Sequence, residues 1–363
     1  MHPLLISDVV SNYTQLSEVT KSGKRFGKCP FCHSESNAFS VDVKQNIFFC
    51  YACGEGGSAK DFYVLKHGWP KMKPEKKDPL LLSIYEAAAR FYYQMLVSDS
   101  NPGRRYFVGR GIRVNTATRF GLGYAPDCHA ALYKMLSKTY NQEDILRSGL
   151  VRKNDAGEIY DFFRNRVMFP VFDNNGDVVA FGGRTLNEKY GPKYINSAES
   201  EIFSKRKNLY GYPYCAENRG RRLIICEGYM DLITIQEAGF LDSAAVLGTA
   251  LTEEHARIIA SDYKEVCLSL DSDKAGVHAA KQSISILKRH GLTITVPDYA
   301  PFKDPDEFIR KAGVRAFQER LDRALPAEVF LARNSVDNIS ELTDIMVEYF
   351  ENSEKKDGIR RVG

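Results

Sequence analysis

Four cysteines occur in two close pairs with the spacing of a metal site. Cys29 and Cys32 form the first Cys-x2-Cys pair, Cys50 and Cys53 form the second, and seventeen residues separate the pairs. Two such turns present four thiolates to one ion, which is the ligand set of a structural tetrahedral zinc site. His33 adjoins Cys32 and is an alternative ligand, but Cys-x2-Cys geometry favours the cysteine. Reduced cysteines without a metal are the competing interpretation.

The segment between the cysteine pairs has the pattern of a β-hairpin. Apolar and polar residues alternate over 39–43, a Gln-Asn turn follows at 45–46, and 47–49 is apolar. A segment this small needs zinc to hold its fold. Two roles stay open for its aromatic residues, which are either a small core or, with nearby basic residues, a surface that stacks and steers single-stranded DNA. These residues are Phe48, Phe49, Tyr51, Lys24, Arg25, Lys28 and Lys44.

Acidic residues follow two apolar segments in the C-terminal half. Glu227 comes directly after 223–226, and Asp271 and Asp273 follow 266–270. Ligands bind at the carboxyl ends of strands in a parallel sheet, where these side chains would meet. Clustered carboxylates cannot all stay ionised without a cation, and oxygen-rich sites of this kind select Mg²⁺ or Mn²⁺. The sequence therefore predicts a divalent-metal site that acts on a phosphorus centre.

A further acidic group, at 303–307, follows the last expected strand and would reach the same edge. The alternative role for a single aspartate here is to cap a helix, and Asp304 before Pro305 fits that role well. Capping does not require the combination of Glu227 with Asp271 and Asp273, so we favour a metal site for these three.

Positive charge is concentrated in one segment. The chain has a formal net charge of +4, and residues 151–222 alone contain thirteen Lys and Arg against nine Asp and Glu. A solvated surface is the simplest explanation of such a cluster. Next to a carboxylate cluster, however, a basic segment is what phosphoryl transfer along a polyanion requires.

The elements that would position these residues indicate a multidomain α+β and α/β protein. A charged, proline-containing linker precedes a helical pattern at 80–96, and a hairpin pattern joins 167–172 to 178–181. Strand and helix patterns then alternate, which predicts a mainly parallel sheet. The expected domains are a zinc ribbon (1–70), a linker (71–79), a mixed α+β basic subdomain (80–220), an α/β domain (221–313) and a short helical segment (314–363).

Within the α/β domain the alternation is regular. The expected strands are 223–226, 244–247, 266–270 and 292–296, and the expected helices are 229–238, 253–260 and 275–290. No run of eighteen apolar residues occurs, and the first residues lack the pattern of a signal peptide. We therefore expect a protein of the cytoplasm with no membrane partner.

Several motifs resemble known sequences. The Glu-Gly and Asp-x-Asp arrangement resembles the Toprim domain of primases, topoisomerases and some nucleases. Further motifs resemble the DnaG-type primase family of bacteria and phages, in the family's order over about residues 20–325. They are RFGLGYAP (119–126), RNRVMFP (164–170), FGGR (181–184), PKYINS (192–197), FSK (203–205), EGYMD (227–231) and LGTALT (247–252).

The resemblance implies two sets of site residues. Catalytic divalent metals, two or more, would bind Glu227, Asp231, Asp271, Asp273, Asp304 and Asp306. The groove for template or incoming nucleotide would be formed by Arg164, Arg166, Arg184, Lys193, Asn196 and Lys205.

The function implied is that of a DNA primase, which makes short RNA primers on single-stranded DNA from ribonucleoside triphosphates. The alternatives are a Toprim nuclease or topoisomerase-like enzyme, and a non-catalytic zinc-dependent DNA-binding replication factor. Cys32 stands where cellular relatives usually have histidine. Those relatives also continue into a helical domain that docks on the replicative helicase, so this chain is expected to be a fragment or to recruit its helicase differently. We expect a monomer.

Overall fold

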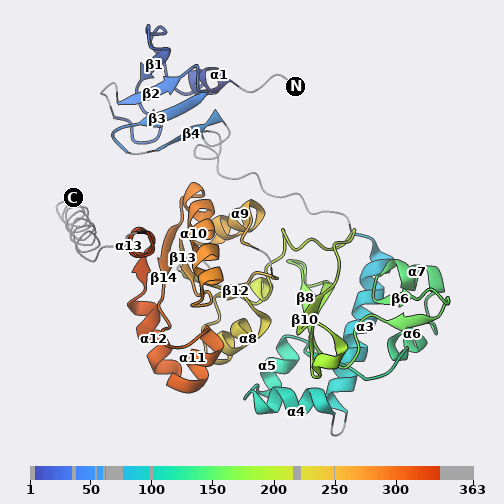
Figure 1. The fold of residues 1–363 in the computed structure, drawn as a ribbon. Coiled ribbons are helices and arrows are strands. Elements are labelled where there is room, and N and C mark those ends of the chain that lie inside the picture. Colours follow the sequence, from blue (N-terminus) through green and yellow to red (C-terminus); the bar gives the residue numbers. More distant parts are fainter. Residues whose placement is uncertain are drawn as a thin grey trace. The chain divides into compact units, whose positions relative to one another are not determined.

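The computed structural model describes residues 5–34, 38–53, 55–59, 62, 77–98, 101–215, 222–248 and 250–335 (Figure 1). The chain divides into two compact units, Met1–Glu75 and Lys76–Gly363. Most of the predicted linker, residues 71–76, lies outside the described residues. None of the helices in these ranges is long and apolar enough to cross a bilayer.

The N-terminal unit is built on a four-stranded antiparallel sheet, in the order β1-β2-β3-β4. Asn46 adopts the left-handed conformation in the predicted turn, and its side-chain oxygen accepts a hydrogen bond from the Ile6 N–H. This bond ties the first helix to the hairpin. The elements are α1 (Ile6–Ser11), β1 (Lys24–Gly27), β2 (Phe39–Asp42), β3 (Ile47–Cys50) and β4 (Gly56–Ser58).

The second unit begins with helices packed on an antiparallel sheet of order β10-β9-β8-β5. The predicted hairpin is β8 with β9, and the predicted long helix is α3, which Asp78 caps and Pro79 begins. The helices are α3 (Pro79–Val97), α4 (Pro102–Gly109), α5 (Val114–Arg119), α6 (Ala131–Leu136) and α7 (Gln142–Arg147). The strands are β5 (Gly123–Ala125), β8 (Arg166–Phe172), β9 (Val178–Thr185) and β10 (Tyr194–Asn196), with a separate hairpin of β6 (Val151–Lys153) and β7 (Ile159–Asp161).

The remainder of the unit is an α/β domain around a five-stranded sheet of order β12-β11-β13-β14-β15. The first four strands are parallel, as predicted, and β15 adds an antiparallel edge within the segment expected to be helical. The strands are β11 (Arg222–Cys226), β12 (Ser243–Ala245), β13 (Glu265–Leu268), β14 (Thr293–Val296) and β15 (Leu325–Pro326). The helices are α8 (Tyr229–Glu237), α9 (Glu253–Asp262), α10 (Lys274–Arg289), α11 (Pro305–Ala312), α12 (Val314–Asp322) and α13 (Ala327–Arg333), and short 3-10 turns occur at η1 (Glu188–Tyr190) and η2 (Tyr212–Tyr214).

The two halves of this second unit share a hydrophobic core. The Tyr229 ring, at the start of α8, stacks on Phe169 of β8 with centroids 4.8 Å apart and contacts Tyr210 at 4.6 Å. Gly182 of β9 makes this approach feasible, because a Cβ atom there would lie 2.3 Å from the Tyr229 ring. The subdomain that contains β8 and β9 is therefore packed directly against the α/β domain. This packing fixes the geometry of any site that lies between the two.

Candidate metal centres and active site

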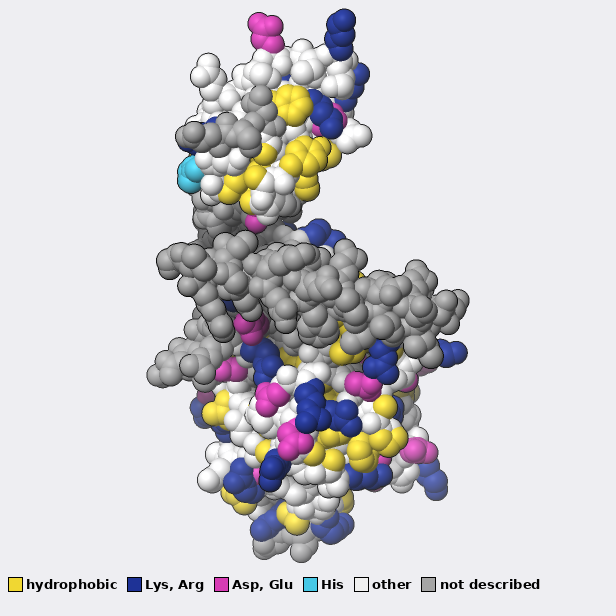
Figure 2. Space-filling model, turned by 90° about the vertical axis from the view of Figure 1, so that its left-hand side faces the viewer, with side chains coloured by type: hydrophobic (Ala, Val, Ile, Leu, Met, Phe, Trp, Pro, Cys, Tyr) yellow, Lys and Arg dark blue, Asp and Glu magenta, His cyan; other side chains and the backbone are white. Residues whose placement is uncertain are grey.

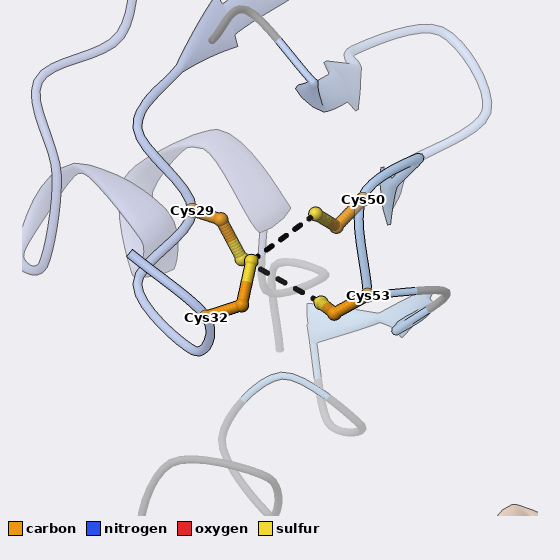
Figure 3. Close-up of side chains that lie close together, drawn as sticks. All are labelled: Cys29, Cys32, Cys50 and Cys53. Atoms are coloured by element: carbon orange, nitrogen blue, oxygen red, sulfur yellow. Dashed lines mark hydrogen bonds between the residues drawn. The ribbon is translucent and has the colours of Figure 1, made fainter. Parts of the chain in front are cut away.

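The four predicted cysteines converge in the N-terminal unit (Figure 3). Their sulfur atoms all lie within 4.8 Å of one another, and both the Cys29–Cys53 and Cys32–Cys50 sulfur pairs are 3.9 Å apart. Ligands at about 2.3 Å from a tetrahedral zinc ion are separated by about 3.8 Å, so the observed spacing fits a zinc ion well. His33 does not belong to this group of candidate ligands.

The electrostatics of the cluster also fit a cation. Burial raises the pKa of the Cys29 thiol, and burial with hydrogen bonding to the other sulfurs raises the pKa of Cys53 to about 12. At Cys50, burial is outweighed by backbone hydrogen bonds from Cys53 and Ala52, which lower its pKa to about 7. A zinc ion among the four sulfurs would supply the positive charge that keeps them all as thiolates.

The hairpin aromatics differ in their exposure to solvent. Phe48 is in the core of the unit, whereas Phe49 and Tyr51 are 40% and 65% exposed, with their rings 4.9 Å apart. The alternation of β3 explains this division, because successive side chains point to opposite faces. Figure 2 shows hydrophobic side chains beside Lys and Arg on the surface of this unit.

A pocket of about 540 Å³ lies at the carboxyl edge of the parallel sheet in the second unit. Acidic side chains of the α/β domain form one part of its lining, and basic side chains of the preceding subdomain form another. Of the predicted residues, it is lined by Glu227, Asp231, Asp271, Asp304, Asp306, Arg184, Lys193 and Asn196. The fold therefore brings most of both predicted sets to one cavity.

Two of the carboxylates, Glu227 and Asp271, follow the neighbouring parallel strands β11 and β13. The Glu227 carboxylate accepts a hydrogen bond of 3.2 Å from the Asp271 N–H. Burial raises the pKa of Glu227, and burial together with the Glu227 charge raises the pKa of Asp271 to about 6. On α8, burial and the charges of Asp304 and Asp271 raise the pKa of Asp231 to about 7. Charge repulsion of this kind is relieved by a bound divalent cation.

The remaining acids have partners of their own. Asp273 caps α10 by accepting from the Gly276 N–H at 2.9 Å, and it does not line the pocket. Asp304 caps α11 in the same way, as the sequence allowed, but it does line the pocket. Among the described residues, only the four cysteines form a group of three or more candidate ligands within 4.8 Å. The carboxylates thus surround the cavity without meeting at one point.

Asp306 is the central acid of an arginine network. One of its oxygens accepts from Thr234 at 2.7 Å, and the other lies 2.7 Å from Arg110 and 2.8 Å from Arg310. Because Arg110 follows α4 and Arg310 belongs to α11, this network joins the two halves of the unit at the pocket. Both carboxylate oxygens of Asp306 already have hydrogen-bond or ion-pair partners. Its main role in this structure is therefore to hold Arg110 and Arg310 in place at the pocket.

On the basic side, Asn196 and Arg184 are held by aromatic side chains. The Tyr229 hydroxyl donates to the Asn196 side-chain oxygen at 2.8 Å, and the Arg184 guanidinium lies over the Tyr106 ring, 4.5 Å from its centroid. These contacts fix both polar groups at the cavity wall. Arg184 and Lys193 supply positive charge opposite the carboxylates, which suits a ligand with phosphate groups.

Three predicted groove residues do not line the pocket. Arg166 is 2% exposed, and its guanidinium donates to the carbonyl oxygens of Gly183 and Pro192, so it supports the β9–β10 segment from inside. Arg164 lies over the Tyr160 ring at the surface. The Lys205 carbonyl oxygen is hydrogen-bonded to the ring of His255, which belongs to the first turn of α9. Lys205 therefore lies beside the start of that helix.

Nine residues outside the two predicted sets also line the pocket. They include the basic Arg110, Lys303 and Arg310 and the aromatic Tyr194. Lys303 lies 3.8 Å from Asp271. A signal was available for Lys303 and Arg310, because Lys303 begins the acidic segment at 303–307 and Arg310 follows it by three residues. Arg110 is 117 residues before Glu227, and only folding reveals that it belongs to the site.

Family models match three consecutive parts of the chain. They are the CHC2 zinc finger at residues 2–69, the N-terminal domain of the DNA primase catalytic core at 91–216 and a Toprim-like domain at 224–309. A zinc finger followed by the N-terminal domain of the primase catalytic core and a Toprim-like domain is a domain order that defines the DnaG type.

Similar proteins point to the same class. The DNA primase of Clostridium acetobutylicum is 36% identical over 92% of this chain, which spans 60% of that protein. The structure of the zinc-binding and RNA polymerase domains of Aquifex aeolicus primase matches with a TM-score of 0.66 and 30% identity, over 94% of this chain and 88% of that one. A DnaG primase catalytic domain bound to single-stranded DNA matches with a TM-score of 0.65 and 32% identity, over 70% and 82% of the two chains.

This chain belongs to the DnaG primase family. The predicted family and fold class are confirmed by these similarities, as is structural zinc at the level of the zinc-finger family. The chain covers between 53% and 60% of the length of the curated relatives it matches.

Proposed function

We propose that this chain is a DNA primase, which joins ribonucleotides into short RNA primers on a single-stranded DNA template. The observation that carries the proposal is the pocket in which Glu227, Asp231 and Asp271 face Arg184 and Lys193. Nucleotidyl transfer requires both kinds of group, because phosphate charge must be neutralised while the reacting oxygen is activated. The family relationship supports the same activity.

The carboxylates are proposed to hold the catalytic metals, two or more Mg²⁺ or Mn²⁺ ions. Oxygen-only ligands favour these ions, and the raised pKa values of Asp231 and Asp271 supply the reason that a cation binds. Glu227, Asp231, Asp271 and Asp304 are the ligands that the pocket supports best. Asp273 and Asp306 remain predicted ligands, and each would have to share its carboxylate with its present partners. When bound, such ions lower the pKa of an attacking hydroxyl and neutralise phosphate charge.

The basic wall is proposed to orient the ribonucleoside triphosphate. Arg184 and Lys193 neutralise its phosphates, and the side-chain amide of Asn196, held by Tyr229, offers a hydrogen bond to the sugar or base. The 3′-hydroxyl of the primer attacks the α-phosphate in line, and pyrophosphate leaves. Arg164 and Lys205 lie outside this pocket, so their proposed partner is template DNA. The buried Arg166 would act only by supporting Lys193.

The N-terminal unit is proposed to hold the template. Its exposed Phe49 and Tyr51 offer ring faces for stacking unpaired bases, and basic residues of the same sheet would contact phosphates. The solved DnaG primase catalytic domain bound to single-stranded DNA supports this class of substrate, although through the second unit and not the first. A cytoplasmic monomer is part of the same proposal, and a contact with a replicative helicase remains a prediction.

Primer synthesis on defined templates tests the proposal. Labelled ribonucleotides, single-stranded DNA and Mg²⁺ or Mn²⁺ should give short RNA products, and Asp271→Asn should abolish them while the circular dichroism spectrum is preserved. Glu319→Gln, which removes one exposed negative charge on α12, is the matched control and should be fully active. Nicked or relaxed plasmid without primers would favour the Toprim nuclease or topoisomerase alternative. DNA binding without metal-dependent incorporation would favour the non-catalytic factor.

A further inference from the structure

Lys303 brings a loosely held positive charge to the acidic side of the pocket. Its ammonium lies 3.8 Å from the Asp271 carboxylate, and its side chain is 62% exposed. Two arginines that line the same pocket are held more closely, because Arg110 and Arg310 pair with Asp306 at 2.7 and 2.8 Å. An exposed ion pair contributes little to stability, so the contact between Lys303 and Asp271 is easily broken.

The backbone of Lys303, in contrast, is fixed in place. Its carbonyl oxygen accepts a hydrogen bond of 2.8 Å from the Ser272 N–H, and its own N–H donates to the Glu307 carboxylate at 3.0 Å. The preceding Phe302 packs edge-on against the Phe308 ring of α11, with centroids 5.2 Å apart. The root of the lysine side chain is thus held at the pocket, while its flexible four-carbon stem allows the ammonium to move.

The electrostatic role of this ammonium changes when the pocket is filled. Without divalent cations, it offsets part of the repulsion among Glu227, Asp231 and Asp271. With divalent cations on these carboxylates, the ammonium faces like charge, which repels it from Asp271. A triphosphate chain brings negative charge into the same cavity, so the phosphates then become the favoured partner of the ammonium.

We propose that Lys303 is a movable counter-ion, which neutralises Asp271 in the metal-free pocket and contacts the phosphate chain of the ribonucleoside triphosphate once divalent cations hold the carboxylates. The side chain lines the cavity, as both positions require. The proposal rests on the primase function proposed above and adds a phosphate-binding residue to it. It also implies competition between the ammonium and a divalent cation for the Asp271 carboxylate. A plain surface ion pair would affect neither metal nor phosphate binding.

Binding of Mn²⁺ to the zinc-loaded full chain, without nucleotide or DNA, tests the competition. Lys303→Met keeps a long side chain but removes the charge, so Mn²⁺ should bind about threefold more tightly, or better, at low ionic strength. Electron paramagnetic resonance of the free Mn²⁺ measures this affinity. Lys303→Arg restores the charge and should return the affinity toward that of the wild type.

Binding of inorganic triphosphate tests the second position of the ammonium. In isothermal titration calorimetry at saturating free Mg²⁺, Lys303→Met should bind triphosphate about threefold more weakly, or worse, because one charge-assisted contact is lost. The same substitution therefore strengthens metal binding and weakens phosphate binding. A general loss of structure would instead weaken both.

Lys311→Met is the matched control for the loss of one lysine charge. Lys311 is 60% exposed on α11, close to the exposure of Lys303, and it pairs with Glu307 at 2.8 Å. It is not among the residues that line the pocket. Because its partner is not a predicted metal ligand, both affinities should stay at the wild-type values.

Three results would overturn the inference. They are an Mn²⁺ affinity that is unchanged or weaker in Lys303→Met, a triphosphate affinity that is unchanged or stronger in that variant, and equal shifts in Lys311→Met. Primer synthesis by the wild type is measured in the same preparations. A chain that makes primers without the two opposite shifts would refute only the role of Lys303. A chain that shows both shifts but makes no primers would refute only the primase proposal.

Discussion

Replacing Gly182 with alanine should destabilise the second unit. It should also disturb the pocket, because the same side chain, Tyr229, is displaced in both effects. Gly182 does not have a positive φ, so alanine meets no backbone strain there and the effect is steric. The added Cβ would lie 2.3 Å from the Tyr229 ring, whereas carbon atoms in contact are normally about 3.5–4.0 Å apart. The ring or the strand must therefore move by more than about 1 Å.

The ring has little freedom to move. Tyr229 is stacked on Phe169, packed edge-on against Tyr210, and bonded through its hydroxyl to Asn196. Overpacking of a core costs about 1–3 kcal/mol, and we expect a value near the upper end, about 3 kcal/mol. For a unit of this size, that corresponds to a decrease in Tm of roughly 6–12 °C.

Differential scanning calorimetry of the full chain with zinc measures this change in the transition of the second unit. Gly109→Ala is the matched control, because that glycine ends α4 and no atom lies within 4 Å of its added Cβ. Because alanine has a higher helix propensity than glycine, Gly109→Ala should raise the free energy of unfolding by up to about 1 kcal/mol. In a double-mutant cycle, the penalty of Gly182→Ala should nearly vanish once Tyr229→Ala has removed the ring. A decrease below about 2 °C, or the same penalty with and without the ring, would refute the reasoning.

Three further predictions concern the charged groups and the zinc. Asp306→Ala should lower the stability of the second unit by about 1–3 kcal/mol, because it leaves Arg110 without its carboxylate near the pocket, and calorimetry would contradict us if Tm were unchanged. Folding raises the pKa of Asp231 to about 7 and of Asp271 to about 6, so the folded metal-free chain binds more protons than the unfolded chain and should lose stability as pH rises from about 4 to 7. Saturating Mg²⁺ should remove that loss, which urea titrations at each pH can measure. If the stability of the metal-free chain did not change with pH, the proposed carboxylate cluster would be contradicted. Zinc chelation, or Cys29→Ser, should unfold the N-terminal unit and leave the Tm of the second unit unchanged, which limited proteolysis and calorimetry can verify.

Local patterns in the sequence determined much of this protein. The spacing of Cys29 and Cys32 from the second pair specified the zinc site, because tight turns fix thiolates at short range. Alternation of strands and helices predicted the parallel sheet, and its direction placed Glu227 and Asp271 at one edge. These features depend on residues near one another in sequence, or on the regular geometry of strands.

Only the tertiary structure decided which charged side chains face the pocket. Arg110 enters it through its ion pair with Asp306, a contact between residues 196 positions apart for which no local pattern exists. Arg166 is turned inward to buried carbonyl groups, and the Asp273 carboxylate caps a helix. A charged residue in a motif is visible in sequence, but its direction depends on which hydrogen-bond partners the folded chain brings within reach.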